Sequence, residues 1–185
     1  RQMKHAVVYC IVGIALAFAG ASLGGLGWLL LWPAVSYLGM GAAYAGLGPR
    51  VCGKRPDGRI SWWAVLLLLP FLVATWAGWH AIRRFSREAC CHEVAPGVWV
   101  GRRPLPGDLP PDASLVVDLT AEFPLWKGVC DGRTYLCVPT LDATAPNEAA
   151  LRRAVETAAA WEGTVYIHCA LGHARSAMTA AAVLI

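Results

Sequence analysis

The sequence predicts an α-helical membrane anchor of about three spans, followed by an α/β domain with a central sheet flanked by helices. The 185-residue chain is 57% hydrophobic and 15% charged, with a mean hydropathy of +0.48, which is too apolar for an ordinary soluble domain. The apolar excess lies in residues 6–82, and the rest alternates strand-like and helix-like segments. We therefore expect the anchor at residues 1–88 and the α/β domain at residues 89–185.

The anchor contains three apolar segments, at residues 6–22, 26–47 and 60–82. A bilayer core needs about 20 helical residues, so the 42 residues of the stretch 6–47 fit two helices joined by a tight turn. A polar loop at residues 48–59 precedes the third segment. Tryptophans near the ends of that segment are typical of an interfacial belt, and these are Trp62, Trp63, Trp76 and Trp79.

Small residues recur at helical spacing in the first two apolar segments, as Gly20-x3-Gly24 and Gly39-x3-Ala43. Small side chains let helix backbones approach closely in a membrane. The pattern fits packing within the three-helix bundle, and it also fits a homodimer interface.

The α/β part has four β-prone runs, at residues 97–101, 115–119, 134–138 and 164–168. Pro146 is expected to open a helix with Asn147 and Glu148 in its first turn. A second helix is expected over residues 177–185. Because strands and helices alternate, crossover connections should place the loop after the last strand at the carboxyl end of a sheet.

The loop after the last strand contains the main candidates for a catalytic site. Within eight residues, between a strand and a helix, it carries Cys169, Gly172, Arg175 and Ser176. Backbone N–H groups at such a helix start favour an anion. Arg175 can hold two oxygens of a phosphate, and the same positive field lowers the pKa of Cys169. A thiolate in this cradle can attack phosphorus to give a phosphocysteine, while Ser176 hydrogen-bonds the sulfur.

His168-Cys169-x5-Arg175-Ser176 resembles the H-C-x5-R-S/T signature of the protein tyrosine phosphatase superfamily, closest to its dual-specificity branch. The resemblance covers residues 95–185 and implies a dual-specificity phosphatase-like fold, with Cys169 as nucleophile and His168 and Ser176 in supporting roles. It implies that the phosphate lies against Ala170, Leu171, Gly172, His173, Ala174 and Arg175. Members of this branch add helices after the signature, so we expect the domain to be cut short at residue 185.

The chemistry also needs an acid for the leaving oxygen. The family carries an aspartate on a loop before the cysteine, and Asp142, 27 residues before Cys169, follows a strand and precedes a helix. Asp118, at the end of a strand, is the competitor, with structural hydrogen bonding as its expected role. Asp131 lies in an Asp-Gly turn and is the weakest candidate.

Other polar residues near the motif have two interpretations each. His173 could touch substrate or face solvent. Arg102 and Arg103 could contact a second anionic group, although solvated side chains or lipid headgroup contacts are the favoured interpretation. The seven cysteines form no zinc pattern and no disulfide framework, so neither a metal nor another cofactor is expected.

The charge distribution bears on partners and location. The net charge of +4 lies largely beside the apolar segments, which suits membrane lipids rather than nucleic acid. Three spans place the N-terminus and the α/β domain on opposite sides, and the flanking basic residues number six and five, nearly a tie. A reactive thiolate persists best in a reducing compartment, so we expect an integral protein of a bacterial-type inner or cell membrane with the domain in the cytoplasm.

These features predict a membrane-anchored, cysteine-dependent phosphatase. An anchor joined by a short linker favours a lipid phosphate as substrate, of the phosphatidylglycerophosphate or phosphoinositide type. A phosphatase for membrane-proximal phosphoproteins is the alternative. A catalytically silent phosphate-binding scaffold is the second alternative.

Overall fold

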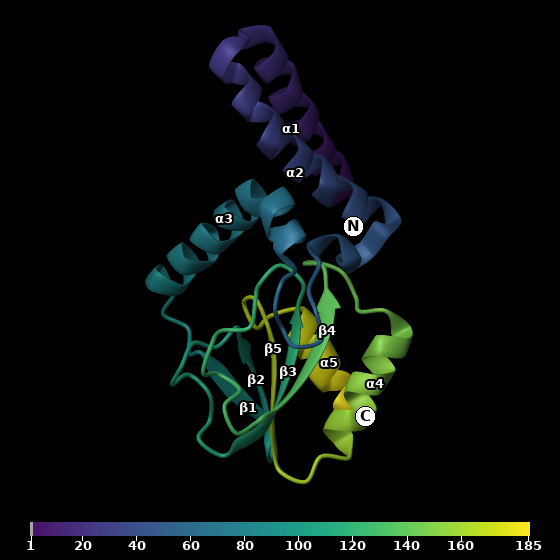
Figure 1. Ribbon diagram of the computed structural model, residues 1–185. Coiled ribbons are helices and arrows are strands. Elements are labelled where there is room, and N and C mark those ends of the chain that lie inside the picture. Colours follow the sequence, from purple (N-terminus) through teal and green to yellow (C-terminus); the bar gives the residue numbers. More distant parts are fainter. Residues whose placement is uncertain (1) are drawn as a thin grey trace.

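The computed structural model describes residues 2–185 and contains the two predicted parts (Figure 1). Three long apolar helical segments come first, and a mixed α/β domain with a five-stranded sheet follows. Arg1, which we counted among the six flanking basic residues on the N-terminal side, lies outside the described residues.

The three helical segments are each long and apolar enough to cross a membrane, over Gln2–Leu23, Gly25–Cys52 and Trp62–Phe85. The first is α1 (Gln2–Leu23) and the third is α3 (Trp62–Phe85). The second is a chain of shorter elements, η1 (Gly25–Leu30), α2 (Leu31–Ala42), η2 (Ala43–Leu47) and η3 (Gly48–Cys52). It therefore runs into the stretch predicted as a polar loop, with a break at Gly46, whose φ of 144° is not helical.

In Figure 1 the α1–α2 pair extends away from the sheet, and both its lower end and α3 lie next to the α/β domain. Close packing of α1 against the second helical segment depends on small residues, since a Cβ atom at Gly20 would lie 2.8 Å from the carbonyl oxygen of Gly27 in η1. This contact supports the interpretation of Gly20 as part of the bundle. A homodimer through the small-residue faces stays a prediction.

The sheet contains β1 (Cys91–Ala95), β2 (Val98–Arg102), β3 (Ala113–Thr120), β4 (Thr134–Thr140) and β5 (Thr164–Cys169). Its order is β1-β2-β5-β3-β4, with β1 antiparallel to β2 and the remaining neighbours parallel. The four predicted strands are thus present, and β5 is central. The sequence did not reveal β1, because this largely exposed edge strand lacks an apolar alternation.

Two helices of the domain, α4 (Glu148–Ala159) and α5 (Arg175–Val183), pack on the face of the sheet that carries Val117 and Ile167. The prediction that Pro146 opens the first helix was wrong by two residues. Asn147 is the N-cap, and its side-chain oxygen accepts hydrogen bonds from the backbone N–H groups of Ala149 and Ala150. In residues 2–185 the helices of the domain cover this face alone, so the sheet is not flanked by them on both faces.

Successive side chains of a strand point to opposite faces of the sheet, so neighbouring residues of β5 lie on different faces. Val165, Ile167 and Cys169 of β5 join the core beneath the helices. His168 and Asp118 belong to the other face. The loop between η3 and α3 descends over that face in Figure 1 and is closed by a β-bridge between Lys54 and Ile60.

Candidate active site

The loop between β5 and α5 wraps around the sulfur of Cys169. Gly172 donates its backbone N–H to that sulfur at 3.2 Å, and the hydroxyl of Ser176 lies 3.3 Å from it. Gly172 has a φ of +86°, and a Cβ atom there would lie 2.7 Å from the carbonyl carbon of Gly101. Glycine is therefore required at this position by both conformation and space.

The environment of Cys169 favours a thiolate. Burial alone would raise the pKa of this thiol, but the hydrogen bond with Ser176 and the positive charge of Arg175 outweigh burial and lower the pKa below its usual value. A larger fraction of Cys169 is consequently ionised near neutral pH than for an ordinary cysteine. This is the property that a nucleophilic cysteine needs.

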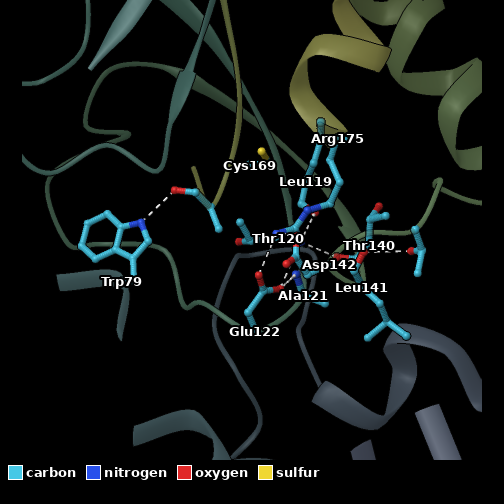
Figure 2. Close-up of polar contacts among 12 residues, drawn as sticks. Trp79, Leu119, Thr120, Ala121, Glu122, Thr140, Leu141, Asp142, Cys169 and Arg175 are labelled. Atoms are coloured by element: carbon cyan, nitrogen blue, oxygen red, sulfur yellow. Dashed lines mark hydrogen bonds and ion pairs between the residues drawn. The ribbon is translucent and has the colours of Figure 1, made fainter. Parts of the chain in front are cut away.

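Arg175, the first residue of α5, is 1% exposed and reaches the ends of two neighbouring strands (Figure 2). Its Nη1 donates to the carbonyl oxygens of Thr140 at 2.7 Å and Leu119 at 3.3 Å. Both terminal nitrogens bind the carboxylate of Glu122, at 2.8 and 3.2 Å. Burial would lower the pKa of Arg175, but Glu122 more than compensates and raises it.

Glu122 was not predicted as a site residue from the sequence. The only signal for it in the sequence is an acidic residue three positions after the strand-like run 115–119. The neighbouring residues are apolar, and a charge buried among them would need a partner. Since Glu122 holds one edge of the guanidinium, Arg175 keeps a fixed direction. The Nε atom of Arg175 is buried and has no hydrogen-bond partner within residues 2–185, so one donor is left for a ligand.

Asp142 lies just after β4, and its Oδ1 is 3.1 Å from Nη2 of Arg175. Its side chain is 71% exposed, in contrast to the buried arginine. The next residue, Ala143, has a φ of +56°, a left-handed conformation that is uncommon for alanine. The structure thus brings the predicted Asp142 to the predicted Arg175 in a tight turn.

Asp118 has the structural hydrogen bonds that we expected. Its carboxylate binds Nζ of Lys54 at 2.6 Å, the hydroxyl of Tyr135 at 2.7 Å and the hydroxyl of Thr120 at 2.7 Å. Burial would raise the pKa of Asp118, but the ammonium of Lys54 lowers it far below the usual range. Asp131 lies in the turn region before β4, as predicted.

The two histidines of the motif differ in environment. His168 is 2% exposed, and its Nε2 lies 3.8 Å from Oδ1 of Asp118. Burial lowers the pKa of His168 to about 4, against the opposing effect of Asp118, so the ring is neutral at pH 7. His173 is exposed, and its Nε2 lies 2.9 Å from a carboxylate oxygen of Glu88.

Side chains from the apolar helical segments contact the loops of the site directly. Trp79 of α3 donates its indole N–H to the carbonyl oxygen of Ala170 at 2.7 Å, as Figure 2 shows, and Trp76 donates to that of Glu122 at 2.9 Å. Tyr44 of η2 donates its hydroxyl to the carbonyl oxygen of Asp142 at 3.0 Å. The assignment of Trp76 and Trp79 to an interfacial belt was therefore wrong, because their N–H groups are used by the α/β domain.

The favoured interpretation of Arg103 as a solvated or headgroup-bound residue was also wrong. The side chain is buried and donates to the carbonyl oxygen of Pro124 at 2.8 Å. Its guanidinium lies within 5.5 Å of the ring centroids of Trp79, Phe123 and Trp126. Burial lowers the pKa of Arg103.

Among residues 2–185, no group of three or more His, Cys, Asp or Glu side chains is arranged to hold a metal ion. All seven cysteines are free thiols. No protein-family model matches this chain, and no curated protein sequence matches it significantly.

Proposed function

We propose that the protein is a membrane-anchored, cysteine-dependent phosphatase whose α/β domain is of the dual-specificity phosphatase type. One observation carries the proposal: Cys169, with a lowered pKa, lies in a loop that opens α5, next to a buried arginine with a free donor. The sequence signature from His168 to Ser176 supports the same activity. No metal or other cofactor is needed, because the loop and Arg175 supply the positive field.

In the first step the thiolate of Cys169 attacks phosphorus and the bond from phosphorus to the leaving oxygen breaks. Asp142 gives its proton to that oxygen, and the alcohol leaves. In the second step Asp142 accepts a proton from water, whose oxygen attacks the phosphocysteine and releases inorganic phosphate and the thiolate. Arg175 and the backbone N–H groups of residues 170–174 stabilise the transferring phosphoryl group in both steps.

The roles of the remaining site residues follow from their contacts. Ser176 stabilises the sulfur as it leaves, and buried His168 has the supporting role that the signature implies. The side chain of His173 is paired with Glu88, so its contribution to phosphate binding is its backbone N–H. Glu122 positions Arg175.

For the substrate we propose a membrane lipid phosphate, of the phosphatidylglycerophosphate or phosphoinositide type, hydrolysed on the cytoplasmic side. Contacts of Trp79 and Tyr44 with the loops support this, since they hold the site against the membrane segments. Phosphoproteins close to the membrane are the alternative substrates. A silent phosphate-binding scaffold is disfavoured by the lowered pKa of Cys169, which binding alone does not require.

The test is hydrolysis of para-nitrophenyl phosphate by the full chain in lipid nanodiscs. Wild type should release phosphate, vanadate should inhibit as a phosphoryl mimic, and EDTA should have no effect. Cys169→Ser should abolish turnover and still bind vanadate, because the cradle remains while the nucleophile is lost. Turnover by Cys169→Ser, or an EDTA-induced loss that zinc or magnesium restores, would exclude the proposed mechanism.

A further inference from the structure

A cavity of about 220 Å³ lies where the membrane segments meet the loops of the site. On one side it is lined by Met40, Phe71 and Gly78 of α2 and α3, and on the other by Phe123, Leu141 and Leu171 of the α/β domain. Two separate parts of the chain thus form one apolar space. Helices long and apolar enough to cross a membrane make up more than half of its wall.

One end of this cavity adjoins the phosphate site. Asp142 and Glu122 belong to its wall, and the carboxylates of both contact Arg175. Ala170, the residue after Cys169, also lines it. A phosphate bound in the Cys169 loop therefore has the apolar space beside it.

The side of the cavity that α3 provides is shaped by small residues. Ala74, Thr75 and Gly78 line it between the larger Phe71 and Ile82. A Cβ atom at Gly78 would meet no atom within 4 Å, so the space beside this glycine is empty. A Cβ atom therefore fits at this position, and a larger side chain here would reduce the cavity.

We infer that this cavity holds the hydrocarbon segment next to the phosphate of an amphiphilic phosphomonoester, and that Gly78 provides the room for it. An apolar chain leaves no polar group unpaired in such a space. A phosphopeptide would bring backbone N–H and C=O groups that need partners, and the hydroxyl of Tyr44 is already bound to Asp142. The inference rests on the proposed function and names the part of the site that selects a lipid phosphate.

The experiment compares butyl phosphate with dodecyl phosphate, using the full chain in nanodiscs. The two esters share a phosphate and a primary alkoxide leaving group, so chain length is the variable. Wild type should prefer dodecyl phosphate in kcat/KM, and Gly78→Leu should lower the dodecyl-to-butyl ratio by roughly tenfold, equivalent to about two buried methylene groups. Ala77→Leu is the matched control on the same helix, exposed and outside the cavity wall, and should keep the wild-type ratio.

Thr75→Leu fills the same cavity from one turn earlier and should act like Gly78→Leu if the latter does not fold. Unchanged ratios in both filled variants would overturn the inference, as would faster turnover of a phosphoseryl peptide, whose leaving group is also a primary alkoxide, than of dodecyl phosphate. If wild type hydrolyses neither ester, the proposed function is wrong, and this result does not bear on the cavity. Calorimetric binding of dodecyl phosphate then decides on the cavity: weaker binding by Gly78→Leu than by Ala77→Leu supports it, and equal binding excludes it.

Discussion

At the scale of single residues, the two aspartates near the site are separated by their surroundings. Asp142 is exposed and touches Arg175, whereas Asp118 is buried and bound to Lys54, Thr120 and Tyr135. An acid that serves a leaving group must reach the substrate, and only Asp142 lies in the cavity wall beside the Cys169 loop. The two carboxylates therefore make a matched pair for mutation.

Asp142→Ala should slow hydrolysis of an alkyl phosphate by roughly 100-fold or more, because an alkoxide leaves poorly without a proton. An aryl phosphate with a more acidic leaving group should lose much less. The measurement is kcat/KM against leaving-group pKa for wild type and variant. Asp118→Ala is the control, and a leaving-group dependence in that variant with none in Asp142→Ala would show that Asp118 is the acid.

His168 should make stability depend on pH. Its pKa is about 4 in the folded protein and about 6.5 in an unfolded chain, so between these values the unfolded state binds more protons. The free energy of unfolding should therefore fall as pH drops from 6.5 to 4, by roughly 3 kcal/mol for the full shift. Thermal unfolding of wild type and His168→Gln across this range measures it, and parallel pH profiles would contradict the prediction.

At the scale of elements, α3 acts as a support for the Cys169 loop. Trp79 is 3% exposed, donates a hydrogen bond to Ala170 and stacks against Arg103. The loop is thus held from the side of the membrane helices as well as from the sheet. A loop that is held in this way needs less reorganisation when phosphate binds.

Trp79→Phe should keep an aromatic ring and remove the indole donor, leaving the buried carbonyl oxygen of Ala170 short of one partner. We expect a loss of stability of about 1–3 kcal/mol and a lower kcat for para-nitrophenyl phosphate. Trp62→Phe is the control, since Trp62 is on the same helix and 78% exposed. Equal effects of the two substitutions would show that the hydrogen bond to Ala170 is unimportant.

At the scale of the whole molecule, the apolar helical segments and the α/β domain share one core. Met40 and Leu68 of the helices cluster with Ala121 and Leu141 of the domain. Lys54, in the loop before α3, is fully buried against Asp118. The predicted boundary between an anchor and a separate domain therefore has many contacts across it.

Lys54→Met should destabilise the whole protein by about 3–5 kcal/mol, because it leaves the carboxylate of Asp118 buried without its cation. Adding Asp118→Asn should restore part of this loss, since the uncompensated charge is removed. Thermal unfolding of the two variants and of Asp118→Asn alone forms a double-mutant cycle. Additive effects would mean that the loop and the domain are not energetically coupled.

The sequence by itself determined the features that depend on local order. Apolar runs of membrane length predicted the three helical segments, and β-prone runs predicted four of the five strands. The spacing from His168 to Ser176 was enough to place Cys169 and Arg175 at the two ends of a loop between a strand and a helix. These features need only the period of the backbone and the chemistry of neighbouring residues.

Only the tertiary structure decided which distant groups meet. Glu122 binds Arg175 across 53 positions, Lys54 binds Asp118 across 64, and Trp79 binds Ala170 across 91. In the sequence, nothing distinguishes Trp79 from other tryptophans at the end of an apolar helix. Likewise, nothing distinguishes Arg103 from other basic residues beside a membrane. A buried donor or charge must find a partner, but one sequence does not say which partner, because that depends on how the helices pack on the sheet.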